Sequence, residues 1–236
     1  MAALLGRVRD RFETGEGFAL ATINLDHLVK LRGSDGFRAD YAAQDFVVAD
    51  GNPIVWLSRL AGDPVELVPG SDAVLPLARL AAECGVSVAL IGSTEQSLAA
   101  AADALRARVP GLEIALCVAP PMGFDAASDA AAKLLRDVEV SGARLAFVAL
   151  GAPKQEALAA RGRALAPSVG FASIGAGLDF LAGTQTRAPK WVQAIAMEWL
   201  WRALSSPARL GPRYLKCLAI LPGHGLRALR ARLQKG

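Results

Sequence analysis

Asp50 is the residue best placed to act as a general base. It follows the apolar run Phe46–Ala49, and Gly51 after it leaves room for a ligand to approach. A carboxylate that is partly removed from water at a strand end becomes more basic, as proton abstraction from a hydroxyl requires. The same Asp-Gly pair is common in simple turns, and the local sequence alone favours the turn slightly.

Polar residues also follow two other apolar runs. Thr22 and Asn24 are spaced by two, so their side chains share one side of an extended segment and could hydrogen-bond a sugar or a phosphate. Asn24 could equally cap a following helix. Gly92 and Ser93 stand at a strand-to-helix junction, where backbone N–H groups favour an anion. An ordinary helix cap explains that junction equally well, because no glycine-rich dinucleotide or P-loop fingerprint is present.

A fourth group of polar residues begins a predicted helix. Gly151 ends an apolar run, and Pro153 suits the first helical turn. Lys154 then offers a cation, and Gln155 offers an amide donor and acceptor. Such groups recognise hydroxyls and phosphates, although a charged first turn of a surface helix is the simpler alternative.

Basic residues gather at the C-terminal end of the chain. Residues 1–186 carry 16 lysines and arginines against 21 aspartates and glutamates, whereas residues 187–236 carry 10 against Glu198 alone. The tail is therefore predicted to meet something anionic: nucleic acid, a membrane surface or a phosphorylated ligand. A solvated basic helix face is the alternative. Leucines and basic residues interleave over residues 226–235, which predicts a short amphipathic helix typical of membrane surfaces.

The elements that must position these groups are strands alternating with helices. The predicted strands are 19–23, 46–49, 86–91, 113–118, 145–150 and 169–174. Helical stretches follow over 25–32, from Pro53, over 94–108, over 126–138 and after Pro153. The runs are apolar throughout, which is typical of strands buried on both faces of a parallel sheet. The pattern predicts an α/β domain with helices on both faces, and ligands bind such sheets at the carboxyl ends of the strands.

The composition changes near Thr184. Three of the four tryptophans follow from Trp191 onward, and helical patterning continues with expected breaks at Pro207, Pro212 and Pro222. We therefore expect one α/β domain over residues 1–186 and a basic helical appendage over residues 187–236. The cluster of tryptophans could be core, subunit interface or membrane contact, so a homo-oligomer stays open.

Composition excludes several classes of protein. A chain of 236 residues with 53% hydrophobic residues is not disordered as a whole. Three scattered cysteines form neither a disulfide scaffold nor a zinc spacing, and two histidines exclude a histidine-rich metal site. No signal peptide or membrane span is recognised, which predicts a cytosolic protein. No nucleic-acid-binding motif is recognised, so we expect no nucleic-acid partner.

Six strings in order resemble a known family. They are TINLDH (22–27), FVVADGNPIVWLSRLAG (46–62), GSD (70–72), LGAPKQE (150–156), GLDFLAGTQTRAPKW (177–191) and EWLWRAL (198–204). Together they are similar to the WecG/TagA/CpsF glycosyltransferases, family 26, over about residues 19–215. The resemblance implies a Rossmann-like fold and transfer of a sugar, with inversion, from a UDP-sugar to an undecaprenyl-diphosphate-linked saccharide. The products of such enzymes feed bacterial surface polysaccharides, exopolysaccharides or teichoic acid.

The resemblance also implies roles for individual residues. Asp50 corresponds to the base that deprotonates the acceptor hydroxyl, and no metal cofactor is expected. Thr22, Asn24 and Gln155 match positions near the donor sugar and its diphosphate. The glycines and neighbouring residues of the same strand ends complete the expected substrate-binding set: Gly51, Gly92, Ser93, Gly151, Pro153 and Lys154.

The resemblance assigns a double role to the appendage. It implies that this segment binds the inner face of the membrane and brings arginines over the active site: Arg202 by motif, Arg209 and Arg213 more loosely. Arginine suits a metal-free site, because its planar fork matches the diphosphate on which charge develops. We therefore expect a cytoplasmic protein held peripherally on the membrane.

One string departs from the family pattern. Leu67 and Pro69 stand where the family often has an arginine and a threonine. Another cation, such as Arg59, would then replace the arginine, or the donor sugar would differ. N-acetylmannosamine, its uronic acid and glucose all fit the family. The alternative is a catalytically inactive family member that acts as a scaffold or binding protein.

Overall fold

The chain folds into two compact units, each assembled from separate stretches of sequence. The computed structural model describes residues 1–189, 191–192, 197–198, 201, 204 and 207–235. The first unit contains residues 1–22, 36–48 and 68–185, and the second contains residues 23–35, 49–67 and 186–236. The C-terminal segment thus groups with two short stretches from the first half of the chain. The domain boundary expected at 186/187 stays a prediction.

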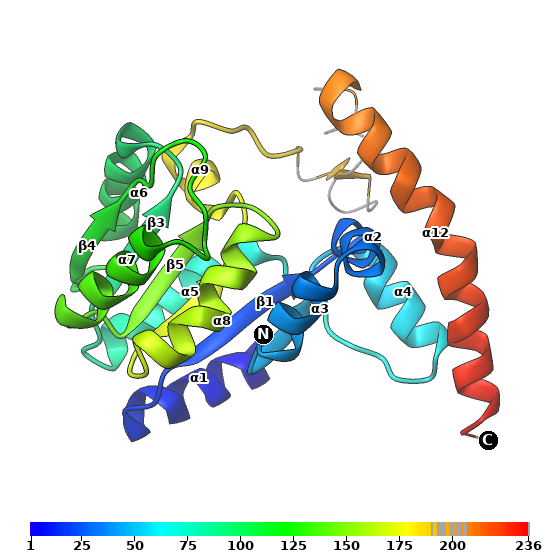
Figure 1. Ribbon diagram of the computed structural model, residues 1–236, viewed down its shortest axis with the longest axis horizontal. Helices are drawn as coiled ribbons and strands as arrows, with labels where there is room; N and C mark the ends of the chain where they lie inside the picture. Colours follow the sequence, from blue (N-terminus) through cyan, green and yellow to red (C-terminus); the bar gives the residue numbers. More distant parts are fainter. Residues whose placement is uncertain (190, 193–196, 199–200, 202–203, 205–206, 236) are drawn as a thin grey trace. The chain divides into compact units, whose positions relative to one another are not determined.

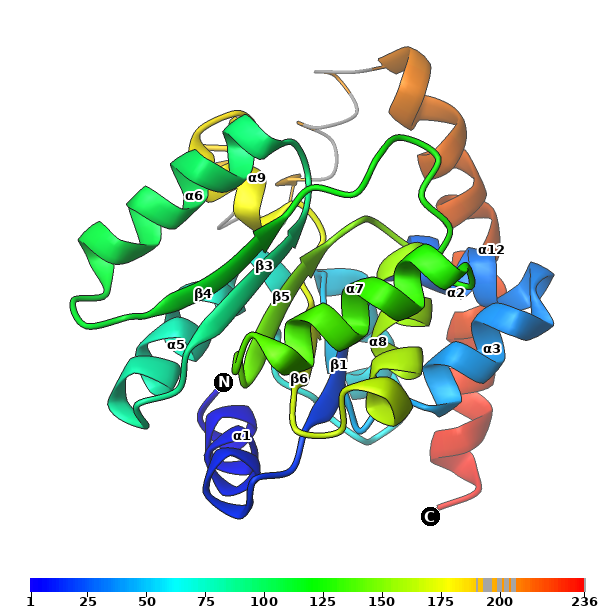
Figure 2. The same cartoon turned by 60° about the vertical axis from the view of Figure 1, so that its left-hand side comes forward.

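A six-stranded parallel sheet forms the framework of the first unit (Figures 1 and 2). The strand order is β2-β1-β6-β5-β3-β4. The strands are β1 (Phe18–Ile23), β2 (Phe46–Ala49), β3 (Val88–Gly92), β4 (Ile114–Val118), β5 (Leu145–Ala149) and β6 (Gly170–Ser173). All six fall on the predicted apolar runs, and the predicted α/β Rossmann-like fold is confirmed.

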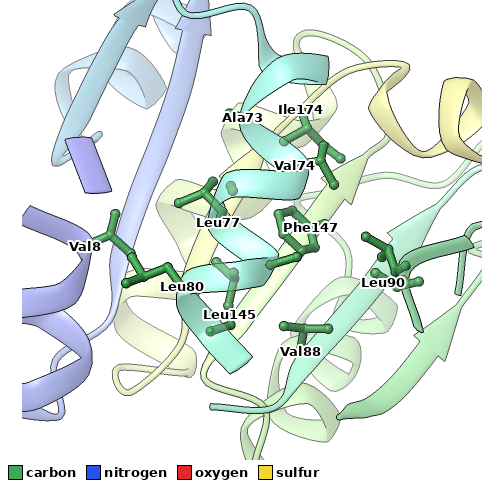
Figure 3. Close-up of a cluster of buried hydrophobic side chains, with 14 of the residues drawn as sticks. Val8, Ala73, Val74, Leu77, Leu80, Val88, Leu90, Leu145, Phe147 and Ile174 are labelled. Carbon is green, nitrogen blue, oxygen red and sulfur yellow. The ribbon is translucent and has the colours of Figure 1, made fainter. Parts of the chain in front are cut away.

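Successive residues of the central strands enter two separate cores. In β5, Leu145 and Phe147 join one hydrophobic cluster, while Ala146 and Val148 join the other. Figure 3 shows part of the first cluster, where Leu77 of a helix lies over the strands near Phe147 and Leu145. This alternation is the two-residue period of a strand whose faces are both covered. It explains why the sequence shows unbroken apolar runs.

Helices cover both faces of the sheet, as predicted. Side chains of α1 (Ala2–Thr14), α5 (Gly70–Glu83), α6 (Glu95–Arg108) and α9 (Gly177–Ala182) build the first cluster. Side chains of α7 (Asp129–Val140) and α8 (Lys154–Leu165) build the second. The first unit also contains α3 (Asp35–Ala42). Helices α1, α3, α5 and α9 were not predicted from the sequence.

Three helices dominate the described part of the second unit: α2 (Leu25–Gly33), α4 (Asn52–Leu60) and α12 (Pro207–Leu233). Helix α12 runs alongside α2 and α4 (Figure 1). The breaks expected at Pro212 and Pro222 are wrong, because the helix continues through both. Both prolines lie on exposed positions, where solvent can satisfy the carbonyl that each ring leaves without its helical partner. Among the described helices, none has both the length and the hydropathy needed to cross a membrane.

Candidate active site

Asp50 lies in the second unit, where β2 passes directly into α4. Its backbone N–H donates to the carbonyl of Ile23 at 2.8 Å, which fixes the end of β2 beside the end of β1. The carboxylate Oδ2 accepts a hydrogen bond from the Asn24 side-chain amide at 3.4 Å. The residue is half-buried. Asp50 therefore belongs to a strand-to-helix junction, not to a turn between two strands.

Asn24 caps the following helix, one of the two roles that the sequence left open, and its role toward a sugar or phosphate stays a prediction. Its Oδ1 accepts from the backbone N–H of His27 at 3.2 Å and so caps α2. Its Nδ2 points the other way, to Asp50. The amide is thus held at both ends, and α2 begins in a fixed position relative to the Asp50 carboxylate.

Gly51 separates Asp50 from the first turn of α4. Its φ of 115° lies in the region that side chains rarely adopt, so glycine is required by the backbone itself. Pro53 occupies the first turn of α4, as its fixed φ and missing N–H predict. Ala49, just before Asp50, forms a parallel bridge with Leu67. Leu67, the residue that departs from the family pattern, is therefore a neighbour of the candidate base.

Gly92 and Ser93 end β3 in the first unit. A Cβ at Gly92 would lie 2.3 Å from the carbonyl oxygen of Ala149 on the adjacent strand, so the close approach of β3 and β5 requires glycine. Ser93 has φ 58°, the one positive value among the non-glycine residues described. Thr94 caps α6 by accepting from the backbone N–H of Ser97 at 3.2 Å. The cap is present, and the anion site at this junction stays a prediction.

The Asp179 carboxylate accepts hydrogen bonds from two serines at the β3–α6 junction. The Ser93 hydroxyl donates to Asp179 Oδ1 at 2.5 Å, and the buried Ser97 hydroxyl donates to the same oxygen at 2.9 Å. Gln185 donates to the other oxygen, Oδ2, at 3.0 Å, and the Thr184 hydroxyl donates to the Asp179 carbonyl at 3.2 Å. One carboxylate of α9 therefore ties the β3–α6 junction to residues 184–185. Sequence reasoning missed Asp179, although it lies inside one of the six strings.

Thr22 and Gln155 have internal partners in the first unit. The Thr22 hydroxyl, on a residue only 3% exposed, donates to the Ser173 carbonyl at 3.4 Å across the β1–β6 pair. Gln155, 2% exposed, accepts from the Gly175 backbone N–H at 3.1 Å and donates to Glu156 Oε1 at 2.8 Å. Its second amide hydrogen is one more donor that the side chain can offer. Thr22 lies near the end of β1, and Gln155 lies in the first turn of α8, the helix that follows β5.

The remaining residues of this string lie at the surface. Gly151, Pro153 and Lys154 are exposed, and Lys154 is the first residue of α8. The Ala152–Pro153 peptide bond is cis. The cation at Lys154 is therefore accessible to an anion, and its role stays a prediction.

The predicted arginines belong to the C-terminal segment. Arg202 and the Arg209 side chain lie outside the described residues. Arg213, on α12, donates through Nε to Asp26 of α2 at 2.8 Å, and Lys30 reaches the other carboxylate oxygen at 2.7 Å. Cys217 lies one turn further along α12, and burial, aided by the Asp26 charge, raises the pKa of its thiol. Asp26 was not singled out from the sequence.

The structure brings the predicted residues together in two groups. Asp50, Asn24, Gly51 and Arg213 lie in the second unit, and the other described ones lie in the first. Within the described ranges, no three histidine, cysteine, aspartate or glutamate side chains gather as ligands of a metal ion would. The expectation of a metal-independent reaction stays a prediction.

Comparison with known protein families gives one match over the full length. The sequence model of the glycosyl transferase WecG/TagA/CpsF family matches residues 1–236. The match includes all six strings and every candidate residue above, which confirms the resemblance that they indicate.

Proposed function

The chain belongs to the WecG/TagA/CpsF glycosyltransferase family, and from that premise we propose that it is an inverting UDP-sugar transferase with Asp50 as its general base. Membership implies a glycosyltransferase of cell-surface polysaccharide biosynthesis that uses a nucleotide-sugar donor and a lipid-linked acceptor. The finer assignment is a UDP-linked hexose, of the N-acetylmannosamine or glucose type, moved to a polyprenyl-diphosphate-linked saccharide.

The observation that carries the proposal is the Asp50 junction. A half-buried carboxylate stands at the carboxyl end of β2, and the Asn24 amide holds one of its oxygens. Ligands of open parallel sheets bind at this end of the strands. The amide N–H donates a hydrogen bond that orients the carboxylate, and it transfers no proton to it. The carboxylate therefore stays available as a base.

The reaction follows from these groups. The acceptor hydroxyl gives its proton to Asp50 while its oxygen attacks the anomeric carbon of the donor. The bond from that carbon to the diphosphate oxygen breaks, and UDP leaves with the electron pair. Attack from the face opposite to UDP inverts the anomeric centre. Cationic side chains stabilise the charge on the departing diphosphate, and Arg213 is a described residue of the right type.

Helix α12 supports a peripheral position on a membrane surface. Large apolar side chains are exposed along it: Leu215, Leu218, Leu226, Leu229 and Leu233. Their positions fall on one side of a helix with a period of 3.6 residues, and Arg227 and Arg230 flank that side. Exposed leucines beside basic residues suit an interface of acyl chains and anionic headgroups.

Acceptor-dependent UDP release tests the proposed reaction. Purified protein is offered several UDP-sugars with a synthetic polyprenyl-diphosphate sugar, and Asp50→Asn is measured alongside. We expect transfer by the wild type and a loss of about 10²–10⁴-fold in Asp50→Asn, the range of general-base contributions. Asp63→Asn, which changes another acid of the same unit, is the matched control and keeps full activity. Absence of both turnover and UDP binding in the wild type favours the inactive scaffold instead.

Vesicle co-sedimentation tests the proposed membrane surface. Leu215 and Leu233 are 69% and 80% exposed on α12, and Val140 on α7 is 87% exposed. Glutamate at either leucine is expected to weaken binding to anionic vesicles, because it removes apolar area and adds repulsion. Val140→Glu makes the same change on a surface outside α12 and should leave binding intact. Equal effects of all three variants would contradict the assignment to α12.

A further inference from the structure

Asp26 holds two cations that come from two different helices. Lys30 lies one turn further along α2 and reaches Oδ2 at 2.7 Å, while Arg213 of α12 reaches Oδ1 at 2.8 Å. Asp26 is 9% exposed, so this is a nearly buried carboxylate and not a flexible surface pair. Two cations on one carboxylate leave a local excess of positive charge beside α2.

The contact to Arg213 is made through Nε alone. Within the described part of the chain, Asp26 is the one partner of Arg213. A guanidinium carries five N–H donors in a rigid plane, so an anchor at Nε fixes the plane and leaves both terminal amino groups for another anion. The Arg213 side chain is 43% exposed, which leaves those groups accessible.

Asp26 also belongs to the helix that adjoins the candidate base. Helix α2 starts at its cap, Asn24, and the same Asn24 side chain donates to Asp50. Asp26 lies in the first turn of that helix, two residues after the cap. The base and the arginine are therefore fixed to one rigid element, through Asn24 and Asp26 respectively. This is the arrangement expected of two groups that act on one substrate.

A buried thiol on α12 lies one turn from the arginine of this ion pair. Cys217 follows Arg213 by one helical turn and is 4% exposed. Burial, with the Asp26 charge acting in the same direction, raises the pKa of its thiol. Water screens the partly buried Asp26–Arg213 ion pair less than it would a fully exposed pair. The attraction between the carboxylate and the guanidinium is therefore stronger.

We propose that Asp26 is a positioning residue that orients the Arg213 guanidinium toward the diphosphate of the nucleotide-sugar donor. The inference rests on the proposed function and adds to it the residue that fixes the arginine. As the bond to the sugar breaks, the diphosphate gains charge and the two terminal amino groups bind it more tightly. Asp26 itself touches neither the donor nor the acceptor.

Three variants distinguish two roles of Asp26: orienting the Arg213 side chain, and merely attaching α12 to α2. Asp26→Asn removes the anchoring charge. Arg213→Lys keeps a cation that can still pair with Asp26 but loses the planar fork. Asp63→Asn is the matched control, because Asp63 pairs with Lys235 at the other end of the described α12 segment. Circular dichroism and vesicle binding report whether α12 stays folded and in place.

For Asp26→Asn and Arg213→Lys we expect kcat to fall about tenfold to a hundredfold with little change in donor KM, because the lost interaction is strongest in the transition state. UDP binding should weaken in both, and Asp63→Asn should match the wild type. Asp26→Asn combined with Arg213→Ala should be no less active than Arg213→Ala alone.

Unchanged kcat in Asp26→Asn, or full activity of Arg213→Lys, would overturn the inference. Higher activity of Asp26→Asn would overturn it too, because Asp26 would then hold Arg213 away from the donor. A wild type without transferase activity would instead overturn the proposed function.

Discussion

The Asn24 side chain caps α2 through Oδ1 while its Nδ2 donates to Asp50 Oδ2 at 3.4 Å. One amide therefore serves the helix and the candidate base together. A side-chain amide makes this possible because its acceptor and its donor are separate atoms. The cap could have been predicted from Asn24 and its sequence context, but the contact with Asp50 depends on the pairing of β1 and β2.

Asn24→Asp separates these two functions. The aspartate can still accept from the His27 N–H and cap α2, but it cannot donate to Asp50 and places a second negative charge beside it. We expect unchanged helicity and a loss of transferase activity of about tenfold to a hundredfold, since a hydrogen bond to a charged group is worth about 1.5–3 kcal/mol. Asn24→Ala should lose the cap as well. Activity assays with circular dichroism would detect the difference, and full activity of Asn24→Asp would contradict it.

Gly92→Ala is expected to destabilise the fold strongly. The new Cβ would meet the Ala149 carbonyl at 2.3 Å, and the φ of 113° is unfavourable for any side chain. Backbone strain and overpacking together should cost about 2–4 kcal/mol in the free energy of unfolding. Urea denaturation would measure it.

Gly151→Ala provides the control for that substitution. Gly151 also has a positive φ, 71°, but nothing lies within 4 Å of its added Cβ. The cost should therefore be the conformational term alone, about 1–2 kcal/mol. Equal losses at the two glycines would show that β3 and β5 do not approach as closely as described.

The fold was largely predictable because each central strand is covered on both faces, which produces unbroken apolar runs such as the one over 145–150. The helix α5 was not predicted, and it contains Pro76, a residue that usually argues against a helix interior. The contact of Ser93 with Asp179 spans 86 residues, so no local pattern reveals it. The same holds for Asp26 and Arg213, whose pairing depends on how α12 packs against α2.

Asp179→Ala should destabilise the β3–α6 junction more than Ser97→Ala does. Removal of the carboxylate takes the acceptor from the Ser93 hydroxyl and the shorter of two contacts from the Ser97 hydroxyl, which keeps Thr184 Oγ1 at 3.3 Å; Ser97 is 2% exposed. Unsatisfied buried groups cost about 1–3 kcal/mol each. Ser97→Ala removes the hydroxyl together with its hydrogen bond, and should lower the free energy of unfolding by about 1 kcal/mol. Denaturant unfolding of both variants gives the comparison, and a larger loss in Ser97→Ala would contradict it.

Leu67→Arg tests whether the departure from the family pattern limits this chain. Leu67 is 37% exposed and bridges Ala49, the residue before Asp50, so an arginine there would add a cation next to the candidate base without burying it. Because the side chain is partly exposed, the free energy of unfolding should change by less than about 0.5 kcal/mol. UDP should bind about tenfold more tightly, since one charge-assisted contact to diphosphate is worth about 1.5 kcal/mol. Isothermal titration with UDP measures this directly. Unchanged affinity would mean that the donor diphosphate lies away from the Ala49–Leu67 bridge.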